Sequence, residues 1–203
     1  MDIYTQLQKY SDYSSGKSEE SCELQYENVT LDNVDFRGYD LNNSSFLEVI
    51  FNRCDFSGVY MSGAFFCGST FNNCILSENI FRKAKASYAT FEATSIDKFD
   101  VLKVEYFHSI SKEMTISNSS FVRGHFYDAS FEHIVFRNTT FNMSLFDKST
   151  FTNVEFINCK FENTDFKDVI GLENIEFSNA SILIDGVWND GLNNEIKELL
   201  LKK

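Results

Sequence analysis

The sequence predicts an all-β protein whose chain coils as a β-solenoid, and three patterns within its 203 residues support this prediction. Eighteen of the 22 Phe fall in one residue class at a spacing of five, between Phe36 and Phe166. Small residues precede these positions by two, and turn-forming residues follow them by two. A backbone that turns once every five residues accounts for all three patterns.

The spacing of five fits neither an α-helix nor a flat strand. From Tyr26 to Phe166 the class has 29 positions, of which 27 are Phe, Leu, Ile, Met, Val or Tyr, and only Ala86 and Ser111 depart. On a helix, residues five apart point about 140° apart, so no single face would be buried. On a flat strand, they would alternate between the two sides. All of them can face one interior only if the chain corners at the same interval.

The residues around each central position fit such a corner. Two residues earlier, 17 of 28 positions are Ser, Thr, Ala, Cys or Gly and six are Val, which lets coils stack densely. Two residues later, Asn and Gly are frequent, and both tolerate turn conformations. The chain has no Pro. This fits a stacked coil, because such a coil needs its backbone N–H groups for pairing with its neighbours.

The five-residue motif resembles that of the pentapeptide-repeat proteins. Cys54–Gly58, Cys-Asp-Phe-Ser-Gly, and Thr164–Asp168, Thr-Asp-Phe-Lys-Asp, show it clearly. The resemblance covers roughly residues 24–186. It implies a right-handed quadrilateral β-helix with four pentapeptides per coil, whereas the period alone does not exclude three. About eight coils at ~4.8 Å would make a rod of roughly 38 Å.

Two stretches depart from the regular pattern. Between Phe166 and Phe177 the phase slips by one residue, so the later centres are Leu172, Phe177 and Ile182, and Gly171 is a candidate bulge. From Asp97 to Thr115 the pattern of large apolar central residues weakens, because the centres are Val101, Tyr106 and Ser111. This segment is read as a distorted coil or, alternatively, as a projecting loop whose length is a multiple of five.

A stacked coil needs a cap at each end. At the amino end, residues 1–23 are expected to hold a short helical lid with Ile3, Leu7 and Tyr10, followed by a mobile segment over 14–20. At the carboxyl end, Asp190 is expected to cap a helix within residues 187–203. The apolar residues predicted to form this cap and a homodimer interface are Trp188, Leu192, Ile196, Leu199 and Leu200. The resemblance to family members that dimerise through this end favours the dimer; a capping helix alone is the alternative.

Charge and composition limit the classes of partner and compartment. The formal charge of -12 disfavours direct binding to nucleic acid or to an anionic membrane. No apolar run approaches the ~20 residues of a membrane helix, and the first residues do not resemble a signal peptide. Five Cys without a CxxC pair predict reduced thiols. The protein is therefore expected to be cytoplasmic.

No catalytic, cofactor-binding or metal-binding constellation is predicted. The three His have no metal-ligand spacing, and the chain lacks the GxxxxGK, GxGxxG and GxSxG motifs. Cys54 and Cys74 are expected one coil apart in the same inward column, at a spacing that a disulfide allows, but packing as free thiols is favoured. The protein is expected not to be an enzyme and to need no cofactor.

Four-fold coiling sorts the outer surface into faces. Face one has the centres 26, 46 and 66, face two 31, 51 and 71, face three 36, 56 and 76, and face four 41, 61 and 81. Outward residues give face four a charge of +2, whereas the other three faces are negative. Apolar outward side chains gather on the adjoining faces four and one, which predicts a partner surface. Its residues are Leu47, Tyr60, Phe65, Ile80, Tyr88, Leu102, Phe107, Val122, Tyr127, Met143 and Leu145.

Two functions are consistent with these features. The first is a non-catalytic interaction module whose rigid rod presents this patch to a protein partner. The second follows from similarity to the quinolone-resistance members of the family, dimeric rods that bind DNA gyrase or topoisomerase IV with a DNA-like acidic surface. Duplex DNA of 38 Å would carry roughly 22 negative charges. The chain has a net charge of only -12, so the first function is favoured.

Overall fold

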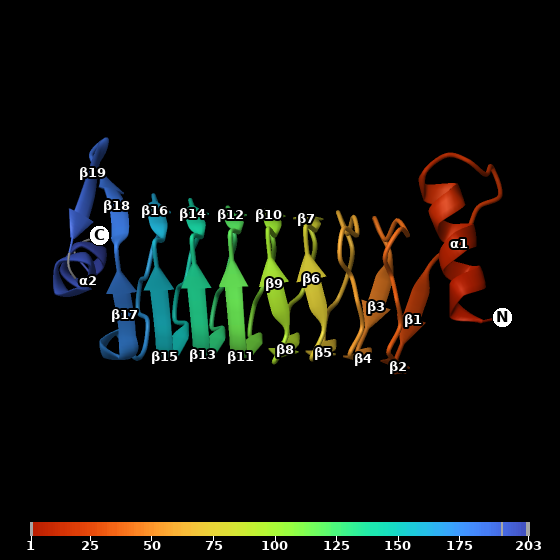
Figure 1. Cartoon of the computed structure of the whole chain (residues 1–203), viewed down its shortest axis with the longest axis horizontal. Helices are drawn as coiled ribbons and strands as arrows, with labels where there is room; N and C mark the ends of the chain where they lie inside the picture. Colours follow the sequence, from red (N-terminus) through yellow and green to blue (C-terminus); the bar gives the residue numbers. More distant parts are fainter. Residues whose placement is uncertain (1, 192, 202–203) are drawn as a thin grey trace.

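The computed structural model describes residues 2–191 and 193–201, and it shows a rod of about eight stacked coils with a helix at each end (Figure 1). In the coils before Gly171, residues lie against those 20 positions later, as in the parallel pairs Phe51↔Phe71 and Phe71↔Phe91. Because each side of the coil takes five residues, a coil has four sides. The quadrilateral β-helix is thereby confirmed.

The strands are mostly three residues long, and they form the flat sides of the coils. The seven-stranded sheet lies on face four, the ten-stranded sheet covers face two and extends onto face three, and β1 pairs with β3 on face one. The elements are α1 (Ile3–Ser14), β1 (Gln25–Glu27), β2 (Thr30–Asp32), β3 (Ser45–Leu47), β4 (Ile50–Asn52), β5 (Thr70–Asn72), β6 (Ile75–Ser77), β7 (Ile80–Arg82), β8 (Thr90–Glu92), β9 (Ser95–Asp97), β10 (Asp100–Leu102), β11 (Ile110–Ser117), β12 (Ser120–Val122), β13 (Ser130–Arg137), β14 (Thr140–Asn142), β15 (Thr150–Ile157), β16 (Lys160–Glu162), the 3-10 helix η1 (Leu172–Asn174), β17 (Ile175–Ser178), β18 (Ala180–Ile184), β19 (Val187–Gly191) and α2 (Asn193–Leu201).

The Phe side chains fill the interior in stacked columns. The rings of Phe36 and Phe56 are 4.4 Å apart at an interplanar angle of 7°, and those of Phe71 and Phe91 are 4.5 Å apart at 3°. From Tyr26 to Phe166, the residue two positions after each centre has a positive φ, for example 53° at Asn33. The predicted column of inward aromatic rings and the predicted corners are both confirmed.

The small polar residues inside the coil also satisfy backbone groups. Ser69 Oγ donates to the carbonyl of Phe46 at 2.8 Å and accepts from the N–H of Val49 at 3.0 Å. Cys74 Sγ points to the carbonyl of Phe51 in the same way, at 3.4 Å. A buried carbonyl without a partner would destabilise the fold, so Ser, Thr or Cys at these positions supplies a donor as well as a small volume.

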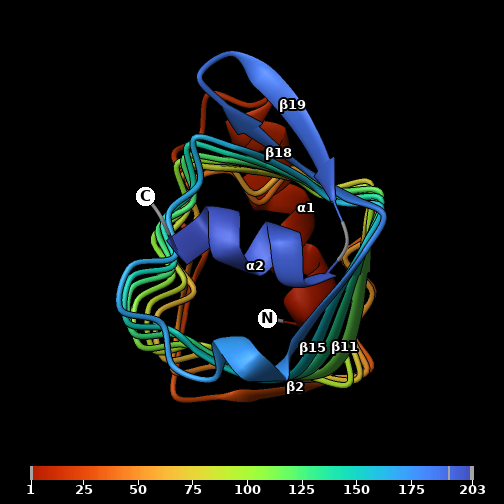
Figure 2. The ribbon, with the colours of Figure 1, turned by 90° about the vertical axis from the view of Figure 1, so that its left-hand side faces the viewer.

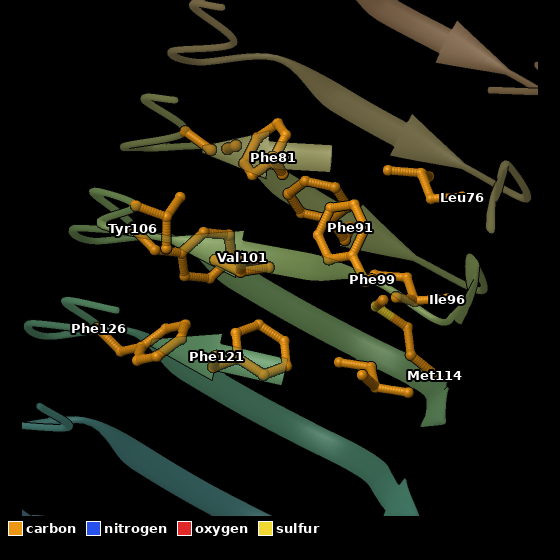
Figure 3. Packing of buried hydrophobic residues seen from close by; sticks show 14 of the residues in the cluster. Leu76, Phe81, Phe91, Ile96, Phe99, Val101, Tyr106, Met114, Phe121 and Phe126 are labelled. Carbon is orange, nitrogen blue, oxygen red and sulfur yellow. The ribbon is translucent and has the colours of Figure 1, made fainter. Parts of the chain in front are cut away.

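The weakened segment 97–115 is a regular coil rather than a projecting loop, because β9, β10 and β11 pair in register with their neighbours. Ser111 lies between Phe91 and Phe131 in its column, and the ring of Tyr106 takes the space of the missing ring. The Tyr106 ring is 5.8 Å from that of Phe91 and 6.4 Å from that of Phe131, and its hydroxyl lies 2.8 Å from Ser111 Oγ. A small apolar cavity of about 50 Å³ remains among these coils. Figure 3 shows the packing of buried side chains in this region, among them Phe91, Val101 and Tyr106.

The predicted phase slip occurs at Gly171. Ile134 pairs with Val154, 20 residues later in the chain. Across the slip, Val154 pairs with Ile175, which is 21 residues later. Gly171 has φ 81° and begins the one-turn helix η1 at a corner, so the additional residue is absorbed by a 3-10 turn. Packing continues beyond it, since Phe177 stacks on Phe156 at 5.3 Å.

Helix α1 covers the amino end of the rod. Asp2 caps it by accepting from the N–H of Thr5 at 3.1 Å, and Leu7 and Tyr10 are buried. Ser11 Oγ accepts from the first-coil N–H of Asp40 at 3.0 Å, which satisfies a donor at the exposed edge. The helix extends to Ser14, the first residue of the segment that was expected to be mobile.

A β-hairpin and helix α2 close the carboxyl end, with α2 lying across the open bore (Figure 2). Strand β19 pairs antiparallel with β18, so residues 187–191 are a strand and not part of the expected helix. Asp190 lies in this strand instead of capping the helix, and Ser181 Oγ donates to its carboxylate. The turn at 185–186 has two consecutive positive φ values, 49° and 78°, as short hairpins require.

Candidate interaction surface

The part of the chain that the structure describes holds neither a cluster of metal ligands nor a helix that could span a membrane. Within residues 2–191 and 193–201, no three His, Cys, Asp or Glu lie close enough together to hold a metal ion. Over the same residues, no helix has the length and apolar character needed to cross a membrane.

Face one presents an aromatic cluster near the middle of the rod. Beyond β3, neighbouring coils on this face are joined by isolated bridges such as Glu105↔His125 and His125↔Leu145. These bridges fix the register, so outward residues 20 positions apart lie one coil apart. We define the aromatic patch by the residues that this register brings together, which are Tyr88, Phe107, His108, His125, Tyr127 and Leu145.

The rings of the aromatic patch contact one another across three coils. Tyr88 stacks on His108 with ring centroids 5.1 Å apart, and His108 meets Tyr127 edge to face at 5.9 Å. Phe107 stacks on His125 at 6.4 Å. Tyr88 nevertheless leaves 66% of its surface exposed. The patch is therefore ordered by its own contacts while its aromatic surface stays accessible.

Charged side chains surround the aromatic patch. His108 Nδ1 lies 2.9 Å from Asp128 Oδ2, so the carboxylate holds the imidazole ring in place. Lys148 Nζ donates to the Tyr127 hydroxyl at 3.0 Å and lies 5.3 Å from the centre of its ring. This hydrogen bond raises the pKa of Lys148. His108 and Tyr127 thus each have a charged partner in the next coil that fixes the position of the ring.

A shallow depression of about 340 Å³ lies within the patch, lined by Phe107, His108, His125, Tyr127, Leu145 and Asp147. Partial burial raises the pKa of Asp147, and the neighbouring carboxylate of Asp165 raises it further. A partner side chain that entered the depression would meet an apolar floor with one carboxyl group at its edge. Apolar groups with a cationic end suit such a site.

The remaining residues of the predicted partner surface are separate from this cluster. Leu47 is half-buried in β3, and the Phe65 ring lies 5.9 Å from Lys85 Nζ, both nearer the amino end. On face four, Tyr60 pairs with Ile80, and Leu102 pairs with Val122. Met143 is exposed at the corner between faces four and one. The predicted surface is therefore two neighbouring strips rather than a single patch.

The structure divides the residues predicted for the cap and dimer into two groups. Ile196 and Leu200 of α2 are buried within the same chain, and Leu199 packs partly against the core. Trp188 lies on β19 and is 45% exposed, with Lys160 Nζ 5.7 Å from its ring. Leu192 lies outside the described residues. The buried side chains belong to the cap, and the exposed tryptophan is accessible to a second molecule.

Sequence reasoning missed the two histidines of the aromatic patch and the charged residues around it. The histidines were considered only for metal-ligand spacing, which they lack, and Asp128, Asp147 and Lys148 were not singled out. A signal was available, because Tyr88, His108, Asp128 and Lys148 follow one another at intervals of 20 residues in one outward column. Examining each column along the rod would have placed the imidazole beside the carboxylate.

Comparison with known families identifies the repeat directly. Residues 30–66 and 117–168 match the model for pentapeptide repeats, with eight copies. Between these stretches the structure keeps the same 20-residue register through β5, β8 and β11. The chain belongs to the pentapeptide-repeat family, as its motifs predicted. No curated protein sequence gives a match.

Solved structures of several pentapeptide-repeat proteins are similar to the chain at low sequence identity. HetL, a pentapeptide-repeat protein involved in heterocyst differentiation regulation from Nostoc sp. strain PCC 7120, is 12% identical, with a TM-score of 0.48 over 93% of this chain and 100% of HetL. Full-length QnrB1, a plasmid-mediated fluoroquinolone resistance protein, is 15% identical, with a TM-score of 0.36 over 88% of this chain and 98% of QnrB1. Rfr23 from Cyanothece 51142 is 14% identical, with a TM-score of 0.22 over 87% of this chain and 100% of Rfr23.

Proposed function

We propose that the chain is a non-catalytic interaction module whose rod presents the aromatic patch to a protein partner. The observation that carries the proposal is the exposed, mutually ordered group of rings from Tyr88 to Tyr127 on face one. Aromatic side chains dominate the energetics of protein interfaces, and rings that are already fixed lose little entropy on binding. The coil supports them on a paired backbone.

Site-specific crosslinking tests this proposal. Benzoylphenylalanine is placed at Tyr88, and in a matched variant at Ile75, an exposed residue of β6 on the opposite face three. We expect one discrete protein adduct from the Tyr88 position in lysate of the source cells, and loss of that adduct when Phe107→Asp is added. Equal adducts from both positions, or an adduct that survives Phe107→Asp, would refute the patch as the docking surface.

The DNA-mimic alternative, in which the chain binds DNA gyrase or topoisomerase IV, is opposed by the charge of the surface. The net charge is -12, and face four carries Arg82, Lys83, Lys103, Arg123 and Lys160. Duplex DNA presents negative charge on every side, at about one charge per 1.7 Å. A rod with a basic side reproduces that pattern poorly.

We also propose that the carboxyl end pairs with a second copy of the chain. Strand β19 is the outer strand of its sheet, and its Val187 and Trp188 are exposed. An edge strand with exposed apolar residues is a ready template for pairing. We expect Trp188→Asp to reduce the mass measured by light scattering to that of a monomer, whereas Tyr60→Asp, at an equally exposed position, leaves the mass unchanged. A monomeric native protein would refute the interface.

A further inference from the structure

Three cationic side chains lie in a row along the corner between faces four and one. Lys83, Lys103 and Arg123 occupy the same corner position in successive coils, and all three are exposed. The N–H of Lys83 donates to Leu102 O at 2.7 Å, and that of Lys103 to Val122 O at 2.9 Å, so the coils are in direct register here. At ~4.8 Å per coil, this corner stripe is about 10 Å long.

The corner stripe has no counter-ions of its own. Among the described residues, none of its three side chains makes an ion pair or a side-chain hydrogen bond, although the chain contains 30 Asp and Glu. The neighbouring cations are neutralised, because Arg82 pairs with Asp100 and Lys85 with Glu105. Like charges in adjacent coils repel each other. The stripe is therefore a concentration of positive charge within an acidic protein.

Apolar side chains lie beside the corner stripe on face four and at its end. Leu102 and Val122 pair across β10 and β12 and are half-buried, and Met143 follows Arg123 at the next corner position. Met143 is 43% exposed. A ligand that lay along this corner would therefore meet the three cations, two half-buried apolar side chains beside them and an exposed methionine at their end.

We propose that this surface binds an amphipathic α-helix that has an apolar face and an acidic edge and lies along the rod axis. Carboxylates at positions i, i+4 and i+7 of a helix span about 10.5 Å, close to the length of the corner stripe. Alternate residues of an extended strand would span about 13 Å over the same three charges. The net charge of -12 opposes an extended nucleic acid as the ligand. This inference is independent of the aromatic patch.

The corner itself supplies a substitution that preserves the fold. Asn43 and Asn163 occupy the same corner position in other coils and have φ 60° and 50°. Lys83→Asn, Lys103→Asn and Arg123→Asn together therefore remove three charges while introducing a residue that this backbone already accepts. Lys98→Asn, Lys112→Asn and Lys167→Asn form the matched control, because they remove the same charge elsewhere on the rod.

Fluorescence anisotropy with two labelled synthetic helices tests the proposal. The probe has Leu on one face and Glu at i, i+4 and i+7 along its edge, and the comparison peptide has Lys at those three positions. We expect the Glu peptide to bind the full-length protein and the Lys peptide not to bind. The corner variant should bind the Glu peptide at least tenfold more weakly, while the control triple variant and Phe107→Asp should bind it like the native protein.

Several results would overturn the proposal. They are failure of the Glu peptide to bind, unchanged binding by the corner variant, and equal weakening by the control triple variant. A labelled 20-base-pair DNA duplex serves as a further probe. Stronger binding of the duplex than of the peptide, lost in the corner variant, would assign the stripe to nucleic acid instead. Failure of the Tyr88 crosslink would refute only the proposal for the aromatic patch, because the peptide assay measures binding at the corner stripe separately.

Discussion

Substitution of Tyr106 tests how the coil tolerates a missing ring at position 111. The Tyr106 hydroxyl lies 2.8 Å from Ser111 Oγ and donates to Ile110 O at 3.2 Å, and both side chains are buried. Tyr106→Phe leaves the Ser111 hydroxyl without a partner in the core, which costs about 1–3 kcal/mol. Ser111→Ala leaves the phenol its second acceptor, so the expected cost is about 1 kcal/mol.

The double variant separates this hydrogen bond from other effects. When both polar partners are removed, no unpaired hydroxyl remains on Ser111, so we expect the double variant to be about 1 kcal/mol more stable than the sum of the two single changes predicts. Denaturant unfolding followed by far-ultraviolet circular dichroism measures each free energy, and Tyr60→Phe at an exposed position is the control. Strictly additive costs would refute the coupling.

Restoring the repeat consensus tests the same packing from the opposite direction. Because the Tyr106 ring already lies between Phe91 and Phe131, we expect Ser111→Phe to destabilise the coil by roughly 1–3 kcal/mol through overpacking. The adjacent cavity of about 50 Å³ is too small for a benzyl group. An increase in the unfolding free energy would show that Tyr106 does not replace the missing ring.

Three further experiments test the turn at Gly171, the depression in the aromatic patch and the DNA-mimic alternative. Gly171→Ala should lower the free energy of unfolding by about 3 kcal/mol or more, because φ is 81° and the new Cβ would overlap Phe151 O. Gly58→Ala, at φ 71° with open space around the new Cβ, should lower it by only about 1–2 kcal/mol. Equal midpoints of denaturation for the two variants would contradict this. Asp147 has a raised pKa in the fold, so the folded state holds its proton more tightly and stability falls as pH rises from the unfolded value of 3.8 through the folded one. Asp147→Asn should therefore raise the melting temperature at neutral pH and leave it unchanged at pH 3. A change at pH 3 with none at neutral pH would refute the raised pKa of Asp147. Purified protein at micromolar concentration should alter neither supercoiling by DNA gyrase nor its inhibition by a fluoroquinolone, and a clear effect on either would revive the DNA-mimic alternative.

The sequence predicted the coil well because one physical requirement recurs in every repeat. An inward ring needs a small neighbour and a positive-φ corner, and Phe56 with Cys54 and Gly58 shows all three requirements within five residues. The slip at Gly171 was visible for the same reason, since a shift of one residue changes every later centre. Local rules of this kind are readable without any knowledge of distant contacts.

The ends and the surface were less predictable because they depend on contacts between residues distant in sequence. Asp190 has the composition of a helix cap, yet pairing with β18 places it in a strand. His108 gains its role from Tyr88 and Asp128, each 20 positions away, and nothing within its own repeat indicates either contact. Outward positions can hold almost any residue, so no periodic rule marks the functional ones.

The 20-residue register has a consequence for how such a protein can grow. Duplication of one whole coil, for example residues 117–136, would leave every later residue beneath the same neighbours as before. The rod would lengthen by ~4.8 Å, and both terminal caps would fit unchanged. An insertion of another length would turn all downstream side chains around the axis. Tandem duplication can therefore move two docking sites apart in fixed steps while each keeps its own composition.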